Sequence, residues 1–231
     1  MIELRWLQPS APDEPLLMDL LDEAERARAL RFQHEADRIA YAAAHALLRA
    51  LLSEVAGGAP RNWRFVRSPT GKPRLDGADG GPDLRFSLSH ARGMVACAVA
   101  PGIDLGVDVE PLSPMPDGLV LARASFSVRE ADGLQALAEP ARSDAFVHLW
   151  TLKEAAHKAS GQGLQDRMEH PEFEPARLTG PDPSPRPLEP CGWLFRQFRP
   201  QGRFALALAY ADDARSGPVR CRPGAIRGVR T

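Results

Sequence analysis

The chain has 231 residues, of which 44% are hydrophobic and 26% are charged, a balance typical of a soluble globular protein with a substantial core. Its 29 basic and 30 acidic residues leave a formal net charge of −1, so bulk charge favours neither a nucleic acid nor an anionic membrane as partner. The three cysteines form no CxxC pair, which indicates buried thiols rather than disulfides or a zinc site. The first ten residues lack the pattern of a signal peptide, and no run approaches the ~18 apolar residues of a spanning helix, so we expect a cytoplasmic protein.

Apolar periodicity predicts the regular elements in chain order. A strand at residues 3–7 and helical spacing at 13–30 precede the clearest helix, which opens at Asp37 and is stopped by Gly57. Strands are predicted at residues 63–66, 84–89, 94–100 and 102–110. Helices follow at 128–137 and 143–160, and a closing hairpin at 194–198 and 204–210.

Each half of the chain therefore offers a long helix followed by strands. This order predicts an α+β fold with an N-terminal lobe at residues 1–110 and a C-terminal lobe at 111–212. Residues 213–231 are basic and rich in glycine and proline, so we expect a disordered tail there.

A pair of carboxylates lies in Gly106-Val-Asp108-Val-Glu110. Alternate side chains of a strand share one face, so Asp108 and Glu110 project together. Neighbouring carboxylates repel each other unless a cation or proton intervenes, and hard oxygen ligands suit Mg²⁺. On spacing alone, the pair is also typical of an ordinary solvated strand edge.

A charged stripe lies in the second long helix, in Trp150-Thr-Leu-Lys153-Glu154-Ala-Ala-His157-Lys158. Glu154 and Lys158 share one helical face because they are four residues apart. Ordinary surface ion pairs, worth ~0.3–0.5 kcal/mol each, would explain such spacing. Apolar neighbours such as Phe146 and Trp150 place part of the stripe near buried surface, which weakens the explanation by surface ion pairs and leaves both explanations open.

Two further segments carry groups suited to phosphate. In Arg67-Ser-Pro-Thr-Gly71-Lys72-Pro73, a flexible glycine beside a lysine lets an N–H and an ammonium approach the same oxygens. Phe86-Ser-Leu-Ser89-His90 ends a strand. A Ser-His hydrolase dyad is disfavoured there, because adjacent strand residues face opposite sides.

In this order and spacing the four segments resemble the 4′-phosphopantetheinyl transferases, of the type that activates the surfactin synthetase. The resemblance spans roughly residues 30–165, and its most specific part is W-x-x-K-E-A-x-x-K-x-x-G-x-G-L at residues 150–164. It implies a Mg²⁺-dependent enzyme that moves the phosphopantetheine arm of coenzyme A to a serine of an apo acyl or peptidyl carrier protein, releasing 3′,5′-ADP. It also implies two similar α/β lobes in a pseudo-twofold relation, with the active site in the cleft between them.

The resemblance also assigns roles to residues. Asp108 and Glu110 from the first lobe and Glu154 from the second would hold Mg²⁺, with Glu154 and Lys158 catalytic. The base that takes the serine proton would be Glu154 or a magnesium-bound water, and both remain open. The residues implied to contact coenzyme A are Arg38, His45, Arg67, Gly71, Lys72, Pro73, Ser89, His90, Asp108, Lys153 and Lys158. Relatives use an extra arginine for the coenzyme A 3′-phosphate, and Arg38 or His45 are its candidates here.

The partner is implied to be a carrier protein that presents its serine among apolar and acidic residues. The segment after Glu110 is unusually apolar for a proline-rich connection, and its docking candidates are Leu112, Met115, Leu119 and Val120. A buried strap between the lobes would explain the same composition. We expect a monomer without nucleic-acid or membrane partners.

Two other functions stay open. One is a protein that binds coenzyme A or a carrier without catalysis, although binding alone needs no trio of carboxylates. The other is an unrelated Mg²⁺-dependent hydrolase of a nucleotide pyrophosphate that uses the same carboxylates.

Overall fold

The computed structural model describes residues 1–76, 81–161, 168–179, 185–213, 216–224 and 226. The described helices are α1 (Glu14–Leu20), α2 (Glu23–Ala29), α3 (Glu35–Ala56), α4 (Gly118–Ser125), α5 (Val128–Gln135) and α6 (Ala141–Ser160). The described strands are β1 (Ile2–Leu7), β2 (Phe65–Arg67), β3 (Pro73–Leu75), β4 (Leu84–Ala91), β5 (Met94–Pro101), β6 (Leu105–Pro111), β7 (Trp193–Phe198), β8 (Phe204–Ala211) and β9 (Val219–Pro223). The mixture confirms the predicted α+β class.

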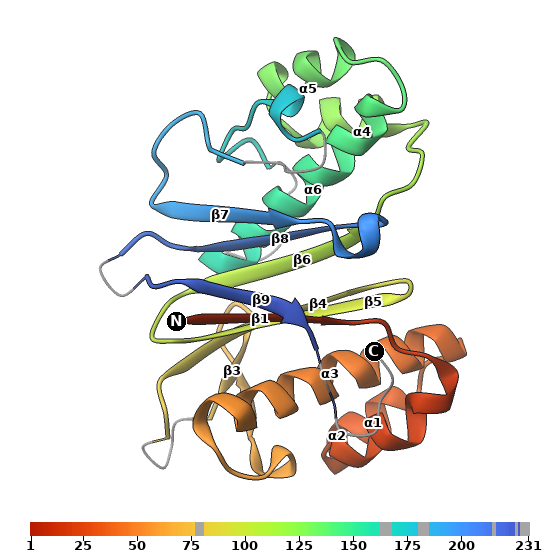
Figure 1. Cartoon of the computed structure of the whole chain (residues 1–231), viewed down its shortest axis with the longest axis vertical. Helices are drawn as coiled ribbons and strands as arrows, with labels where there is room; N and C mark the ends of the chain where they lie inside the picture. Colours follow the sequence, from red (N-terminus) through yellow and green to blue (C-terminus); the bar gives the residue numbers. More distant parts are fainter. Residues whose placement is uncertain (77–80, 162–167, 180–184, 214–215, 225, 227–231) are drawn as a thin grey trace.

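The elements form four layers (Figure 1). A four-stranded sheet, β4-β5-β1-β9, lies against a three-stranded sheet, β6-β8-β7. Helix α3 covers the outer face of the first sheet, with α1 and α2 packed on α3, and α6 covers that of the second, with α4 and α5 packed beside it (Figure 1). A short β2–β3 hairpin stands beside the first sheet. Pseudo-twofold similarity of the two halves stays a prediction.

Three apolar clusters hold these layers together. One lies between α3 and the four-stranded sheet, one between α6 and the three-stranded sheet, and one between the two sheets. Strand alternation explains the division: in β8, Ala205, Ala207 and Ala209 belong to the α6 cluster, whereas Leu206 and Leu208 belong to the cluster between the sheets. By length and composition α3 could cross a membrane, but 67% of its most apolar window is buried, as in a core helix.

The first helices differ in detail from the prediction. The helical segment at residues 13–30 is two helices, because Asp22 caps α2 and accepts a hydrogen bond from the N–H of Glu25. Helix α3 begins at Glu35, two residues before the predicted start at Asp37, and ends before Gly57, whose φ is 79°.

The boundary between the halves lies earlier than residue 110. Strand β6 pairs along its length with β8, from Leu105 opposite Tyr210 to Pro111 opposite Phe204. The expectation that Asp108 and Glu110 come from the first lobe is therefore wrong, since they share a sheet with β7 and β8. A local pattern predicts a strand but not which sheet it joins.

The expected disordered tail is also corrected where the structure describes it. Strand β9 runs parallel to β1 and covers the edge of the four-stranded sheet, with Ile2 opposite Val219. Ile226 is buried in the α3 cluster. The pairing relies on main-chain hydrogen bonds, which leave little trace in side-chain composition.

Candidate active site

Three elements converge on the carboxylate of Asp108. Its Oδ1 accepts hydrogen bonds from Ser89 Oγ of β4 at 2.8 Å and from Lys158 Nζ of α6 at 2.6 Å. Lys158 Nζ also donates to Ser89 Oγ at 3.0 Å. The predicted association of Asp108, Ser89 and Lys158 is thus observed. Strand alternation also holds in β4, where Ser89 is buried and the neighbouring His90 is exposed.

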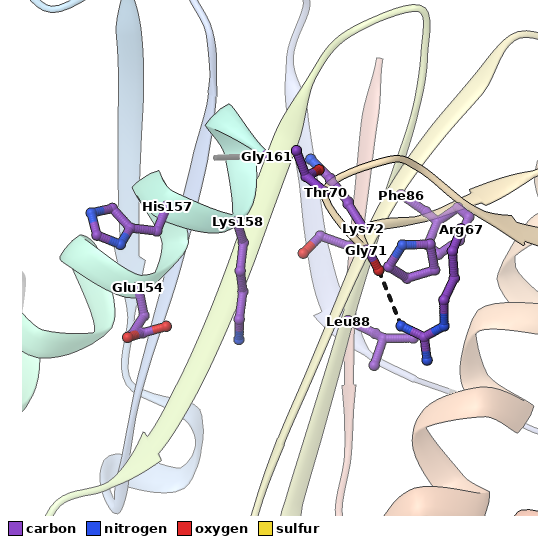
Figure 2. Close-up of a pocket in the computed structure, with 12 residues that line it drawn as sticks. Arg67, Thr70, Gly71, Lys72, Phe86, Leu88, Glu154, His157, Lys158 and Gly161 are labelled. Atoms are coloured by element: carbon purple, nitrogen blue, oxygen red, sulfur yellow. Dashed lines mark hydrogen bonds between the residues drawn. The ribbon is translucent and has the colours of Figure 1, made fainter. Parts of the chain in front are cut away.

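A cavity of about 580 Å³ opens beside this junction. One wall is α6, with Glu154, His157 and Lys158, and the opposite wall is the β2–β3 hairpin with Arg67, Gly71 and Lys72 (Figure 2). Pro73 also lines the cavity, and Phe86, Ser87 and Leu88 of β4 complete it. Residues far apart in sequence therefore face one cavity, as the resemblance implies.

The two carboxylates near Asp108, those of Glu110 and Glu154, have raised pKa values. Burial and the negative charge of Asp108 raise the pKa of Glu110 to about 7, with a further contribution from Glu154. Burial, followed by the charge of Asp108, also raises the pKa of Glu154, and Lys158 opposes both increases. Such mutual repulsion is the arrangement that a bound cation would relieve.

The donors beside Asp108 suit a hard metal ion. Asp108 Oδ2 is buried and has no hydrogen-bond partner among the described residues. All three candidate ligands offer hard carboxylate oxygens, which suit Mg²⁺. In the described part of the chain, no group of three acidic, histidine or cysteine side chains is already gathered as a metal cluster. The residues fit Mg²⁺ by chemistry, and their assignment as ligands remains a proposal.

The β2–β3 hairpin uses its lysine differently from the expectation. Lys72 Nζ donates to Ala159 O at 3.1 Å and to Leu105 O at 3.3 Å, so it caps the last turn of α6 and holds β6. Burial lowers the pKa of Lys72. An ammonium has three donors, so one remains for a ligand. Arg67 donates to Gly71 O at 3.1 Å (Figure 2).

The imidazole of His90 lies within electrostatic range of two positively charged groups, Lys158 and His45. Partial desolvation of the ring, although the residue is exposed at its surface, and the positive charges of Lys158 and His45 lower the pKa of His90. His45 Nδ1 lies 2.9 Å from Glu25 Oε1, and the His45 ring lies 4.3 Å from that of Tyr41. His45 therefore lies near the predicted phosphate contacts.

Arg38 is placed differently. Its Nε donates to Glu14 Oε1 at 2.6 Å, and it does not line the cavity among the described residues. Sequence reasoning missed Arg28, whose guanidinium stacks 5.5 Å from the centroid of Tyr41. In the sequence, only the arginines of the 13–30 segment indicated a basic group here.

Lys153 corrects the prediction most clearly. It is fully buried and forms an ion pair with Glu130 at 2.7 Å, where neither side chain is exposed. Its ammonium also donates to Pro171 O at 2.7 Å and Glu169 O at 3.1 Å. Its assignment to coenzyme A is wrong, because these partners, rather than the cavity, surround it.

Ser87 was also missed. Its Oγ accepts a hydrogen bond from Val107 N–H at 3.0 Å, joining β4 to β6 where their sheets meet. The two-residue period of strand side chains predicts this position, because Ser87 and Ser89 lie on the same face of β4.

The docking candidates divide into two groups. Leu112, Met115 and Leu119 pack partly against the α6 cluster, whereas 69% of Val120 is exposed. A hollow of about 250 Å³ runs from Glu110 past Met115 and Leu121 to Trp150. The segment therefore contains packed residues, as a strap would have, and an exposed residue, as a docking surface would have. Gly163 and Leu164, the end of the long motif, lie outside the described residues.

Family models match both halves of the chain. The model of the 4′-phosphopantetheinyl transferase superfamily matches residues 104–209, and that of the N-terminal part of 4′-phosphopantetheinyl transferases matches 5–102. The division falls between β5 and β6, where the chain passes from one sheet to the other.

Individual relatives extend the match. The chain is 32% identical over 209 residues to the 4′-phosphopantetheinyl transferase HetI of Nostoc sp., covering 89% of this chain and 86% of that protein. It is 29% identical over 155 residues to the transferase Sfp of Bacillus subtilis, covering 67% and 66%. A mouse L-aminoadipate-semialdehyde dehydrogenase-phosphopantetheinyl transferase is 27% identical over 181 residues, covering 75% and 58%. The chain belongs to the 4′-phosphopantetheinyl transferase family.

Proposed function

We propose that this chain transfers the 4′-phosphopantetheine arm of coenzyme A to a serine of an apo carrier protein, with Mg²⁺ required and 3′,5′-ADP released. Family membership supports the class of reaction. The observation that carries the residue assignment is the junction of Asp108, Ser89 and Lys158 beside the cavity that Glu154 also lines.

The reaction forms one P–O bond and breaks another. The serine oxygen attacks the phosphorus that carries the pantetheine arm, the bond to the leaving 3′,5′-ADP breaks, and the serine loses its proton. Glu154 is the sole carboxylate among the described residues that line the cavity, so we assign it as the proton acceptor. Lys158 reaches the same space and supplies positive charge to the phosphate oxygens and the leaving group.

Asp108, Glu110 and Glu154 would hold Mg²⁺, which when bound would offset negative charge on the pyrophosphate. Arg67 and His90 would orient the phosphates. The remaining Lys72 donor can add a contact from the hairpin wall. In place of Arg38, the guanidinium of Arg28 would supply positive charge for the 3′-phosphate, with the imidazoles of His45 and His90 as hydrogen-bonding groups.

The carrier protein would dock where apolar surface adjoins Glu110. Val120, Leu121 and Val128 are 69%, 40% and 72% exposed, and Leu121 also lines the hollow that begins at Glu110. Val120→Asp should raise the KM for the carrier several-fold and leave the KM for coenzyme A and the melting temperature unchanged. Met115→Asp should also destabilise the protein, because Met115 packs partly into the α6 cluster. Normal carrier KM in Val120→Asp excludes docking at that position.

Mass spectrometry of an apo carrier protein after incubation with coenzyme A, Mg²⁺ and the enzyme tests the proposal. A carrier that gains one phosphopantetheine group supports transfer. Coenzyme A breakdown without that gain indicates a hydrolase, and unchanged coenzyme A and carrier indicate a binding protein. Omission of Mg²⁺ with a chelator should abolish the gain.

A further inference from the structure

Helix α6 approaches β6 most tightly at the glycine Gly106, where main-chain atoms of the two elements lie close together. A Cβ added to Gly106 would lie less than 3.0 Å from three main-chain atoms of α6: the carbonyl oxygen of Ala155, the nitrogen of Ala159 and the carbonyl carbon of Lys158. Real Cβ atoms essentially never approach other atoms so closely. Because all three are main-chain atoms, no side-chain rotation relieves the overlap, and any side chain here must move the helix or the strand.

The affected turn is the one that carries the candidate chemistry. Ala155 follows Glu154 and Ala159 follows Lys158, so both functional side chains leave the turn that contacts Gly106. On the strand, Gly106, Asp108 and Glu110 share one face, because they are two residues apart. The contact therefore sets the distance between Lys158 Nζ and Asp108 Oδ1.

The surroundings favour this close approach. Gly106 pairs across the sheet with Ala209, and Ala207 pairs with Asp108, so small residues also line the neighbouring strand beneath α6. The opposite face of β6 bears Val107 and Val109, which belong to the cluster between the sheets. The small residues Gly106, Ala207 and Ala209 therefore lie on the face of the sheet that supports α6.

We infer that Gly106 is a positioning residue for phosphopantetheine transfer: it lets α6 lie close enough to β6 for Lys158 to hydrogen-bond Asp108 and for Glu154 to face the same cavity. The inference rests on the proposed function. Misplacement of about 1 Å can cost 10²-fold in rate. The opposite wall of the cavity is tied to this contact only through Lys72, whereas Arg67 and Phe86 belong to β2 and β4, so coenzyme A binding should weaken less than turnover.

Gly106→Ala tests the inference, with Ala209→Val as a second variant that fills the same space from β8 if the first does not fold. Val107→Ala is the matched control, since it removes core volume from the same strand on the face away from α6. Assays run well below each melting temperature, with coenzyme A affinity measured by calorimetry. Gly106→Ala should lower kcat at least about 30-fold with less than about 3-fold change in coenzyme A affinity, and Val107→Ala should keep wild-type kcat.

Crystal structures of the wild type and of whichever α6-facing variant folds provide a readout independent of activity. The separation of Lys158 Nζ from Asp108 Oδ1 should increase from 2.6 Å to beyond hydrogen-bond distance in the variant. An unchanged separation, or a folded variant with wild-type kcat, overturns the positioning role. A wild type that fails to modify any carrier overturns the proposed function instead, and the structural comparison still decides the geometry.

Discussion

Two lysines of α6, five positions apart in one motif, stand in opposite environments. Lys153 and its partner Glu130 are both fully buried, whereas Lys158 is 31% exposed beside the cavity and its partner Asp108 is 5% exposed. The first pair is enclosed by main-chain partners, because Glu130 also accepts hydrogen bonds from the N–H groups of Ser127 and Phe173. The second pair adjoins space that a substrate can enter. One helix thus separates a fully enclosed ion pair from one that borders the cavity by the face on which each lysine lies.

The largest expected effect is on stability at the enclosed pair. Lys153→Met leaves the Glu130 charge buried without its cation, which should lower the free energy of unfolding by about 3–5 kcal/mol. Adding Glu130→Gln keeps an oxygen for the two N–H groups and removes the charge, so the double variant should recover at least half of the loss. Chemical denaturation gives both values. Activity per folded molecule should stay within about threefold of the wild type, and a specific loss of coenzyme A binding would restore Lys153 to the substrate site.

Lys158→Ala should show the opposite behaviour. We expect a rate loss of at least about 10²-fold, comparable to the loss of one preorganised charge-stabilising group. The loss of stability should be less than half that of Lys153→Met, because Lys158 is partly solvated and Ser89 still bonds Asp108. Steady-state rates and denaturation on the same preparations decide the comparison. Unaltered activity refutes the role of Lys158.

The carboxylates beside Lys158 should rank by their enclosure. Asp108→Ala should cost at least about 10²-fold in rate, since Asp108 joins β4, β6 and α6. Glu110→Gln should cost less, about 10-fold, because an amide oxygen can still reach the cation, and it should raise the Mg²⁺ concentration for half-maximal rate. Titrations with Mg²⁺ test this ranking. A more damaging Glu110→Gln reverses the ligand order proposed here.

A smaller effect concerns the buried histidine of α6. Burial lowers the pKa of His148 to about 4, below its ordinary 6.5, and neither ring nitrogen has a hydrogen-bond partner among the described residues. Between these values the unfolded chain binds the proton and the folded chain does not, so stability falls as pH falls. From pH 7 to pH 5.5 this group should cost about 1 kcal/mol. His148→Leu should reduce the pH dependence of the free energy of unfolding between pH 7 and pH 5.5. An unchanged slope in this variant would assign that pH dependence to other groups.

Local patterns predicted much of the fold and site. The period of two placed Asp108 and Glu110 on one face of β6, and helical spacing placed Glu154 and Lys158 on one face of α6. The hairpin of β7 and β8 was predicted because its strands alternate and adjoin in sequence.

The predictions that were wrong concern contacts between segments that lie far apart in the chain. Apolar residues flank both faces of α6, so the sequence did not show that Lys153 faces Glu130 and Lys158 faces Asp108. The pairing of β6 with β8 and of β9 with β1 joins strands over 90 residues apart. The ammonium of Lys72 meets carbonyls of α6 and β6 that no local motif encodes.

The most direct test of the account is a crystal structure with coenzyme A and Mg²⁺. We expect the pyrophosphate between Lys158 and the β2–β3 hairpin, the metal at Asp108, Glu110 and Glu154, and Lys153 still paired with Glu130. A neighbouring hollow of about 650 Å³, whose lining includes Arg74 and Arg85, offers a competing place for phosphates. Pyrophosphate in that hollow, away from Lys158, would contradict the division of α6 into a structural and a catalytic face.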